Sequence, residues 1–384
     1  MVFRGIDHPD RVLTKKASGS RQGRQPRLRD AVLWTVLSVF AYFLVDGALF
    51  RSGWYLRFLE PNSTAGQVEL RFRLLRNRPP GASPEVLVLG DSRVAEGFSA
   101  PKANAAVDNR LHFENAGISG TTPRAWYYLI RDLDPTARRY AAVVLPLDDY
   151  SDQDAGEELS SRAADLNYLV GRLRITDCFP FASSMSDPTL RLQTFVGCLF
   201  KGIPLRQDLK DFALHYDSRI QSANAWRRDG ALWLDGYGGR PENVSGITAD
   251  WVNRRVNFPA GLSDVQKATI QDSVMSPDIP QTGALTRYRK QWFGRILNRY
   301  KGSSTRILFV ELPRAPIPRP DRAVPARFLD SVRSRPGVVI LPSNTFRDLE
   351  KPELFFDGRH LNKDGQPLFS KQLAIAVFDI LGGR

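Results

Sequence analysis

The sequence predicts an α/β protein, a three-layer α/β/α sandwich around a mainly parallel five-stranded sheet, preceded by one transmembrane helix. Short apolar segments rich in Val and Leu recur along the chain, as is typical of strands buried in a parallel sheet. Segments with helical character lie between them, which favours parallel strands joined by crossover helices. The predicted strands are residues 85–90, 111–117, 140–147, 305–313 and 337–342, and the predicted helices 101–110, 122–133, 288–300, 321–333 and 364–381.

The N-terminal part predicts a single-pass membrane anchor. Residues 1–30 form a basic tail with eight Lys or Arg against three Asp, and residues 31–50 follow with Asp46 as their one charge. Twenty helical residues span about 30 Å, the thickness of a bilayer core. A buried core helix and a cleaved signal peptide are the alternatives, but the basic flank and the length of the apolar segment favour an anchor. The positive-inside rule then leaves the tail in the cytoplasm and the remaining chain outside.

The part beyond the membrane divides into a connector and one large domain. Residues 51–83 are predicted as the connector and residues 84–384 as the domain. The alternation of strand and helix breaks at about residues 151–290, where polar and aromatic stretches show no strong period. We expect this segment to be an insertion near the carboxyl edge of the sheet, where insertions commonly shape a substrate site.

Charge and cysteine content exclude some classes of function. The formal charge is +13, of which the tail supplies +5, and no basic helix or basic-aromatic ribbon typical of nucleic-acid modules is present. We therefore expect no nucleic-acid partner. Cys178 and Cys198 are the two cysteines, and either a disulfide or two buried thiols fits them. Together with four scattered histidines they make no zinc-binding spacing, so no metal or cofactor is predicted.

Three residues far apart in the sequence can form a catalytic triad. Ser92 follows the first predicted strand, and Asp357 and His360 precede the last helix. An Asp-x-x-His pair can hold one ring nitrogen and leave the other as a base. A serine hydroxyl needs such a base to become a nucleophile. Both loops can lie at the carboxyl edge of a parallel sheet, which is where open α/β folds bind their ligands.

In their order along the chain, these motifs resemble the SGNH (GDSL) hydrolase superfamily, whose fold is flavodoxin-like. The resemblance rests on Gly90, Asp91 and Ser92, on Asn115 to Gly117 after the second strand, and on Asp357 to His360. It covers residues 84–150 and 305–384. It implies that Ser92 is the nucleophile, His360 the base and Asp357 the residue that orients it. It also implies that the backbone N–H groups of Ser92 and Gly117 form an oxyanion hole.

The third motif of the family departs from its pattern in this chain. A Gly-x-Asn-Asp block usually follows the third strand, and its Asn completes the oxyanion hole. Here the corresponding residues are Leu147, Asp148, Asp149 and Tyr150. A carboxylate cannot donate a hydrogen bond to an oxyanion, and losing one donor costs about a hundredfold in turnover. Either another group, such as Asn115 or Arg93, takes this role, or activity is low or absent.

The resemblance is greatest to membrane-anchored SGNH-type proteins of bacterial surface-polysaccharide O-acetylation. It implies an O-acyltransferase or esterase in the bacterial inner membrane. Its catalytic domain would lie in the periplasm, and its substrate would be an acyl ester, foremost an acetyl ester, of a cell-surface glycan. A multi-pass membrane protein would hand over the acyl group, because acyl-coenzyme A is not expected outside the cytoplasm. The alternative is a catalytically inactive SGNH-like domain that binds glycans or serves as a scaffold in a membrane complex.

Overall fold

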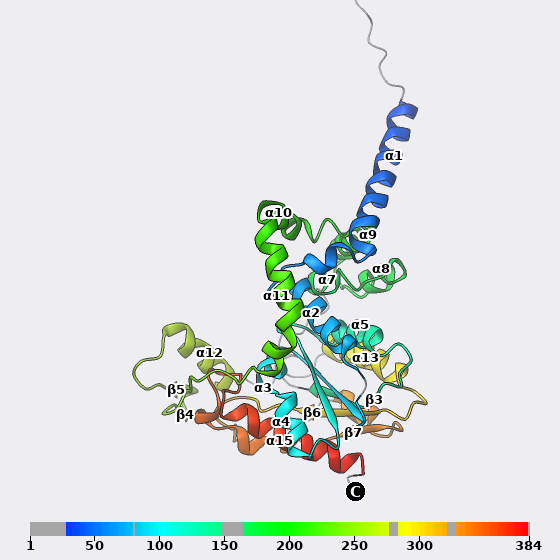
Figure 1. The fold of residues 1–384 in the computed structure, drawn as a ribbon. Coiled ribbons are helices and arrows are strands. Elements are labelled where there is room, and N and C mark those ends of the chain that lie inside the picture. The colour runs from blue at the N-terminus through cyan, green and yellow to red at the C-terminus, as the bar shows by residue number, and fades with distance from the viewer. Residues whose placement is uncertain (1–27, 80, 148–163, 276–282, 321–326, 383–384) are drawn as a thin grey trace, which may run out of the picture. The chain divides into compact units, whose positions relative to one another are not determined.

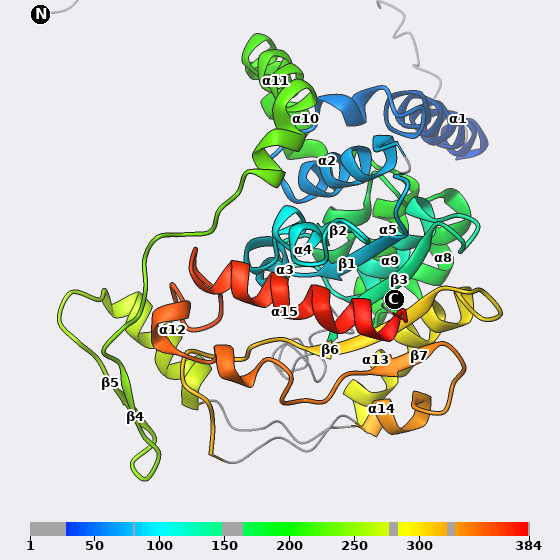
Figure 2. The ribbon, with the colours of Figure 1, turned by 60° about the horizontal axis from the view of Figure 1, so that its bottom comes forward.

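The computed structural model describes residues 28–79, 81–147, 164–275, 283–320 and 327–382. The chain divides into two compact units, Met1–Val45 and Asp46–Arg384. The elements of the second unit are shown in Figures 1 and 2. The helices and strands before residue 150 are α1 (Leu28–Asp46), η1 (Gly47–Arg51), η2 (Tyr55–Phe58), α2 (Thr64–Asn77), β1 (Glu85–Gly90), α3 (Ser92–Gly97), α4 (Ala100–Ala106), β2 (His112–Gly117), α5 (Pro123–Leu133) and β3 (Tyr140–Leu147).

The later elements include most of the predicted insertion and the closing part of the sheet. They are α7 (Ala164–Leu169), α8 (Ile175–Ala182), α9 (Pro188–Leu199), α10 (Arg206–Leu214), α11 (Tyr216–Asp235), β4 (Thr248–Asp250), β5 (Arg255–Asn257), α12 (Asp264–Met275), α13 (Gly283–Arg299), β6 (Arg306–Glu311), α14 (Arg327–Val332), β7 (Val338–Ile340), η3 (Arg347–Leu349), η4 (Pro352–Leu354) and α15 (Gly365–Ile380).

The first unit is dominated by an apolar helix that is long enough to cross a membrane. The helical stretch Leu28–Arg51 has 24 residues, and its apolar part is almost entirely exposed. At 1.5 Å per residue this stretch is about 36 Å long, which exceeds the thickness of a hydrocarbon core. The predicted span 31–50 lies within it. The direction in which the chain crosses stays a prediction.

The predicted five-stranded sheet is present, and all of its strands are parallel. The strand order is β2-β1-β3-β6-β7, with β4 and β5 forming a separate antiparallel hairpin. Figure 2 shows this hairpin away from the sheet. Because β2 lies on one side of β1 and β3 on the other, the chain changes direction across the sheet at β1. Loops that leave the carboxyl ends of strands at such a point form the usual ligand-binding crevice of open α/β sheets.

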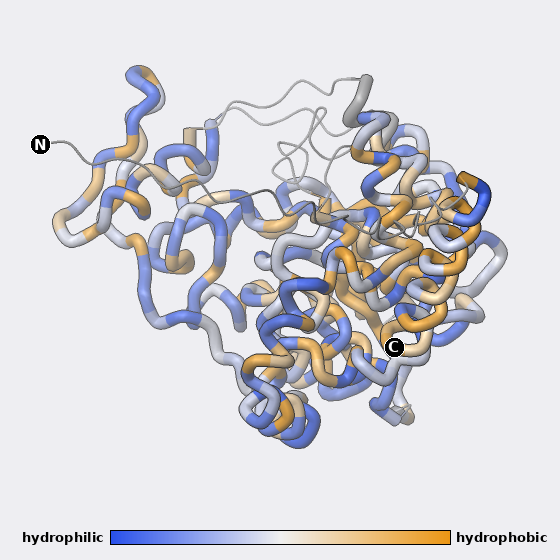
Figure 3. The backbone as a smooth tube through the Cα atoms, turned by 90° about the horizontal axis from the view of Figure 1, so that it is seen from above, coloured by the Kyte–Doolittle hydropathy of each residue, from blue (hydrophilic) through white to orange (hydrophobic). Residues whose placement is uncertain are grey.

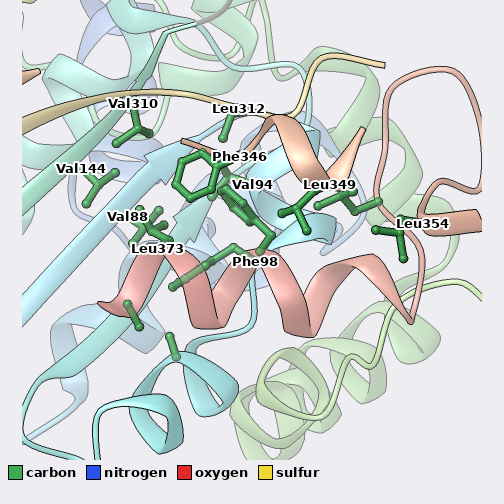
Figure 4. Close-up of a cluster of buried hydrophobic side chains, with 14 of the residues drawn as sticks. Val88, Val94, Phe98, Val144, Val310, Leu312, Phe346, Leu349, Leu354 and Leu373 are labelled. Atoms are coloured by element: carbon green, nitrogen blue, oxygen red, sulfur yellow. The ribbon is translucent and has the colours of Figure 1, made fainter. Parts of the chain in front are cut away.

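Alternate residues of the strands pack into two different clusters of buried side chains. Val86 and Val88 of β1 pack with residues of α4 and α15, while Leu87 and Leu89 pack with residues of α2, α5 and α13. Successive strand side chains point to opposite faces, so helices cover both faces of the sheet. Figure 4 shows the first cluster around α15, and the trace in Figure 3 shows hydrophilic residues in many peripheral turns.

Residues 51–83, predicted as a connector, contain a helix that belongs to the core. Val68, Phe72 and Leu75 of α2 are at most 3% exposed and pack in the same cluster as Leu87 and Leu89. The three positions recur at helical spacing, but polar and arginine residues between them give the segment a hydrophilic average. The division of the chain into domains stays a prediction, although α2 is packed as part of the folded unit.

The junction after the apolar helix is held by polar contacts. Asp46 is 2% exposed and accepts hydrogen bonds from the backbone N–H groups of Lys201 (3.0 Å) and Gly202 (2.6 Å). These bonds compensate the burial of the carboxylate. Arg51 donates to the carbonyl oxygens of Cys198 and Leu199. The lone charge of the apolar segment is therefore a structural group of the second unit.

Cys178 and Cys198 form a disulfide, which resolves the alternative that the sequence leaves open. The bond joins α8 to α9, and the two Cα atoms are 5.4 Å apart. A cross-link closing a loop of this size stabilises a fold by about 3 kcal/mol through the entropy of the unfolded chain. It therefore fixes two helices of the predicted insertion 151–290, of which residues 151–163 and 276–282 lie outside the described residues.

Candidate active site

Ser92 lies at the junction of β1 and α3, where space is limited. Gly90 ends the strand, and a Cβ on it would lie 2.2 Å from Cγ2 of Val94, so a side chain cannot be accommodated there without a shift. The Asp91 side chain caps α3 by accepting a hydrogen bond from the backbone N–H of Arg93 at 2.9 Å. Ser92 is thus the first residue of a capped helix at the carboxyl edge of the sheet.

The same edge holds the end of β2. Gly90 and Gly117 are paired in register, so β1 and β2 end at the same level. A Cβ on Gly117 would lie 2.4 Å from the backbone nitrogen of Ala95, and only glycine allows α3 to approach this closely. The turn after β2 is tied to β1, because Ile118 N–H and the Thr121 hydroxyl both donate to the Gly90 carbonyl.

Asp357 and His360 lie in a tight loop between η4 and α15. Phe355 and Leu361 form an isolated antiparallel bridge, and Phe356 N–H donates to the His360 carbonyl. Within the loop, Oδ1 of Asp357 accepts hydrogen bonds from the backbone N–H groups of Arg359 (2.7 Å) and His360 (2.8 Å). One carboxylate oxygen therefore shapes the turn that carries the histidine.

The structure brings the three predicted triad residues into contact. Oγ of Ser92 and Nε2 of His360 are 2.8 Å apart. Nδ1 of His360 lies 2.8 Å from Oδ2 and 3.1 Å from Oδ1 of Asp357. A carboxylate can only accept, so Nδ1 carries the proton of the neutral ring and Nε2 is left to accept from the serine hydroxyl. This is the arrangement in which an imidazole can act as a general base toward serine.

The electrostatic environment keeps Asp357 charged. Burial by itself raises the pKa of a carboxyl group, but the hydrogen bond and charge of His360 and the two backbone N–H groups outweigh it and lower the pKa of Asp357 below its usual 3.8. The side chains of Asp357 and His360 are 22% and 18% exposed. The pair is therefore reached by solvent while its carboxylate stays ionised near neutral pH.

Two elements of the predicted insertion brace the loop. On one side lies α12: Arg359 donates to Oγ of Ser273 at 2.8 Å and pairs with Asp272 at 2.6 Å. On the other side lies the segment after α11, where Lys363 N–H donates to the Arg240 carbonyl at 2.8 Å. These contacts join residues about 90 to 120 positions apart, so no local pattern in the sequence predicts them. The expectation that the insertion shapes a substrate site stays a prediction.

Aromatic and cationic groups around the loop were also missed from the sequence. The ring of Phe356 stacks on that of His360, with centroids 5.4 Å apart and an interplanar angle of 12°. The guanidinium of Arg240 lies 4.8 Å above the Phe356 ring. Burial first, and then the charge of Arg93, lower the pKa of Arg359 to about 10. The one sign of the Phe356 contact in the sequence is that Phe356 directly precedes Asp357.

Two of the predicted oxyanion donors, the Gly117 N–H and the Asn115 amide, have other partners in this structure. Gly117 N–H donates to the side-chain oxygen of Asn115 at 2.8 Å. The Asn115 amide in turn donates to the carbonyl oxygens of Phe98 (2.7 Å) and Val94 (3.1 Å). Arg93 pairs with Asp91 at 3.1 Å. The oxyanion roles of Ser92, Gly117 and Asn115 stay predictions, and Gly117 would have to exchange its partner to serve.

The third motif of the family falls largely outside the described residues. Asp148 and Asp149, which follow β3 in place of the family's Asn, lie outside the described residues.

Among the residues that are described, no group of three or more His, Cys, Asp or Glu side chains could hold a metal ion. A scan of known protein families and a search of curated proteins both found no match to this chain.

Proposed function

We propose that the chain is an SGNH-type serine O-acyltransferase or esterase, acting on acyl esters, foremost acetyl esters, of a cell-surface glycan. The observation that carries this proposal is the continuous chain of contacts from Ser92 through His360 to Asp357, with both links at 2.8 Å. The three-layer sandwich of the family is part of the proposal, and it is supported by buried helices packed on both faces of the parallel sheet.

The chemistry follows from the direction of the hydrogen bonds. Nε2 of His360 takes the proton as Oγ of Ser92 attacks the acyl carbonyl, and Asp357 stabilises the imidazolium that forms. The proton then passes to the departing alcohol, which leaves an acyl ester on Ser92. In the second half, an acceptor hydroxyl gives its proton to His360 and attacks this ester. The bond from the acyl carbon to Oγ of Ser92 breaks, and Oγ takes the proton back from His360. Water as acceptor gives hydrolysis, and a sugar hydroxyl gives transfer.

The cellular setting is proposed from the basic tail and the apolar helix. An inner-membrane anchor with a cytoplasmic N-terminus would hold the catalytic unit in the periplasm. There the polysaccharide is the acceptor, and a multi-pass membrane protein supplies the acyl group. The helix Leu28–Arg51 supports the anchor by its length and apolar character.

One observation favours a second candidate, a catalytically inactive domain that binds glycans or acts as a scaffold. Gly117 N–H and the Asn115 amide are both engaged with protein groups, so neither is available to an oxyanion in this conformation. Removing a single donor typically reduces turnover by about a hundredfold or more. The two candidates differ in whether an acyl group ever reaches Ser92.

The test uses the full chain in detergent with an activated acetyl ester, followed by mass spectrometry of the protein and of added oligosaccharides. We expect an acetyl adduct on Ser92 that is lost in Ser92→Ala and His360→Ala. His215→Ala is the matched control, because His215 also pairs with an aspartate, Asp211 at 2.9 Å, but is exposed. Acetylated sugar assigns transfer, and acetate alone assigns hydrolysis. Absence of both adduct and turnover would favour the inactive candidate.

A further inference from the structure

A cavity of about 440 Å³ lies between α2 and α11, and the triad does not line it. Its volume is within the range of pockets that hold small molecules. Its apolar wall consists of leucines from η2, the loop after it and α2, together with a tryptophan from α11. These residues are Leu56, Leu59, Leu70, Leu74 and Trp226. An apolar wall of this kind is stabilised when an apolar group covers it.

Small residues of α11 create the space. The two helices are close at Gly230, since a Cβ there would lie 3.4 Å from Leu70 of α2 and 3.3 Å from the Trp226 ring of its own helix. Ala223 and Ala231, seven residues before and one residue after Gly230, line the cavity. The short side chains of these two alanines occupy little of the space between the two helices.

The polar part of the cavity is strongly basic. Its lining includes Arg57, Arg73, Arg78 and Arg227, with Glu69 as the one carboxylate among the described lining residues. Glu69 is already bound by Arg172 at 2.6 and 3.1 Å, and it lies 3.9 Å from Arg73. The lining therefore carries more positive charge than its own carboxylate can balance.

The ion-pair, hydrogen-bond and ring contacts of these arginines leave part of that charge uncompensated. Arg78 pairs with Asp235. Arg57 lies over the rings of Trp54 and Phe58, and Arg227 donates to the side-chain oxygen of Asn224. Among the residues that the structure describes, neither Arg57 nor Arg227 has a carboxylate within ion-pair distance. Burial first, and then the nearby cations Arg172, Arg227 and Arg57, lower the pKa of Arg73 despite Glu69.

An occupant of this cavity must combine a negative group with an apolar one. Arginine forks match the oxygens of phosphate, and the leucines and Trp226 match a hydrocarbon chain. The covalent chain adds a second argument, because Arg57 is six residues after Arg51, where the apolar helix ends. Six residues reach at most about 20 Å, so the cavity stays close to the end of that helix.

We propose that the cavity between α2 and α11 binds a phosphate-bearing lipid, with the phosphate on Arg57, Arg73 and Arg227 and the hydrocarbon on the leucine wall. A second cavity of about 160 Å³ shares Pro61, Leu70 and Trp226 with the first. It offers room for a chain that passes Leu70 and Trp226. Its far side is lined by residues that include Ala95 and Gly117, next to the edge that holds Ser92. The proposal does not depend on catalysis by the triad.

The test titrates the full chain in nonionic detergent with phosphatidylglycerol whose acyl chains are brominated, because bromine quenches nearby tryptophan fluorescence. Wild type should show a saturable component that is absent in Trp226→Phe. The combined substitution Arg57→Gln, Arg73→Gln and Arg227→Gln should weaken this component at least about tenfold. The matched control replaces Arg110, Arg138 and Arg228 by Gln, which are exposed arginines outside the cavity, and should leave it unchanged.

Further arms separate the possible outcomes. Ala231→Phe fills the cavity and keeps its arginines, so it should also abolish the saturable quenching. Circular dichroism and the thermal midpoint check that each variant is folded. Equal quenching by brominated diacylglycerol, which carries no phosphate, or unchanged binding in the triple Gln variant, would overturn the proposal. Displacement of the lipid by millimolar inorganic phosphate would assign the arginines to a small phosphate compound and overturn the lipid assignment.

Discussion

At the scale of single residues, one carboxylate links loop geometry to chemistry. Asp357 shapes its own turn through two backbone N–H groups and also holds Nδ1 of His360. The Asp-x-x-His spacing makes this pairing local, and the sequence predicts it for that reason. The contact between His360 and Ser92 joins residues 268 positions apart, so it depends on both loops reaching the same edge of the sheet.

The lowered pKa of Asp357 predicts a pH-dependent contribution to stability. A carboxyl group whose pKa is lower in the folded state stabilises the fold above its unfolded pKa, and this is lost as the pH falls through the folded value. Asp357→Asn should therefore lower the thermal midpoint most near pH 7, and its difference from wild type should shrink below about pH 4. Thermal scans between pH 2.5 and pH 7 measure this. A difference that stays constant over that range would contradict the lowered pKa.

At the scale of elements, helices outside the predicted α/β core have structural roles that their sequences do not predict. The helix α2 supplies buried residues to one face of the sheet, and α12 braces the loop that carries His360. A Cβ on Gly358 would lie 2.7 Å from Oγ of Ser273, so this loop and α12 are packed without space for a side chain. The insertion thus contributes to the position of the triad.

Burial of α2 predicts a large effect of one substitution in the predicted connector. Phe72 is 3% exposed, and Phe72→Ala should cost about 3 to 5 kcal/mol through lost burial and the cavity left behind. Phe179→Ala is the matched control, because Phe179 is 73% exposed, and it should change stability by less than about 0.5 kcal/mol. Chemical unfolding of both variants of the full chain measures the difference. Similar small losses would show that α2 is only a connector.

At the scale of the whole chain, the apolar helix and the unit Asp46–Arg384 are two compact parts. The second unit begins within the apolar stretch, because Asp46 and Arg51 are hydrogen-bonded to backbone groups between Cys198 and Gly202. Residues 46–51 of the apolar stretch therefore belong to the second unit. The disulfide between α8 and α9 lies close to Arg51 in space, since the Cys198 carbonyl oxygen accepts a hydrogen bond from Arg51.

The basic tail predicts the direction in which the chain crosses the membrane. Eight Lys or Arg before the apolar helix should keep the N-terminus in the cytoplasm. Alkaline phosphatase fused after Arg384 should then be active in intact bacteria, because its disulfides form only in an oxidising compartment. The same fusion without residues 1–45 is the control and should be inactive. An inactive full-length fusion that stays in the membrane fraction would reverse the orientation.

Much of the fold was accessible from the sequence, because its signals lie within short windows. The five strands follow from runs such as residues 85–90, and the apolar helix from residues 31–50. The α2 helix was not recognised as core, because its buried positions alternate with arginines and only packing shows which face is covered. The hydrogen bond from Gly117 N–H to the Asn115 side chain was also not predicted, because it depends on the position of that side chain in the folded chain.

The sequence by itself determined the parallel α/β sheet, the apolar helix and the identity of the Ser92, His360 and Asp357 set. Each depends on residue type and spacing along the chain, which local sterics and hydrophobic periodicity control. Only the tertiary structure decided that the three residues touch, that Cys178 bonds to Cys198, and that α2 and α11 enclose a basic cavity. Those features join distant segments, and their geometry is set by how helices and loops pack on the sheet.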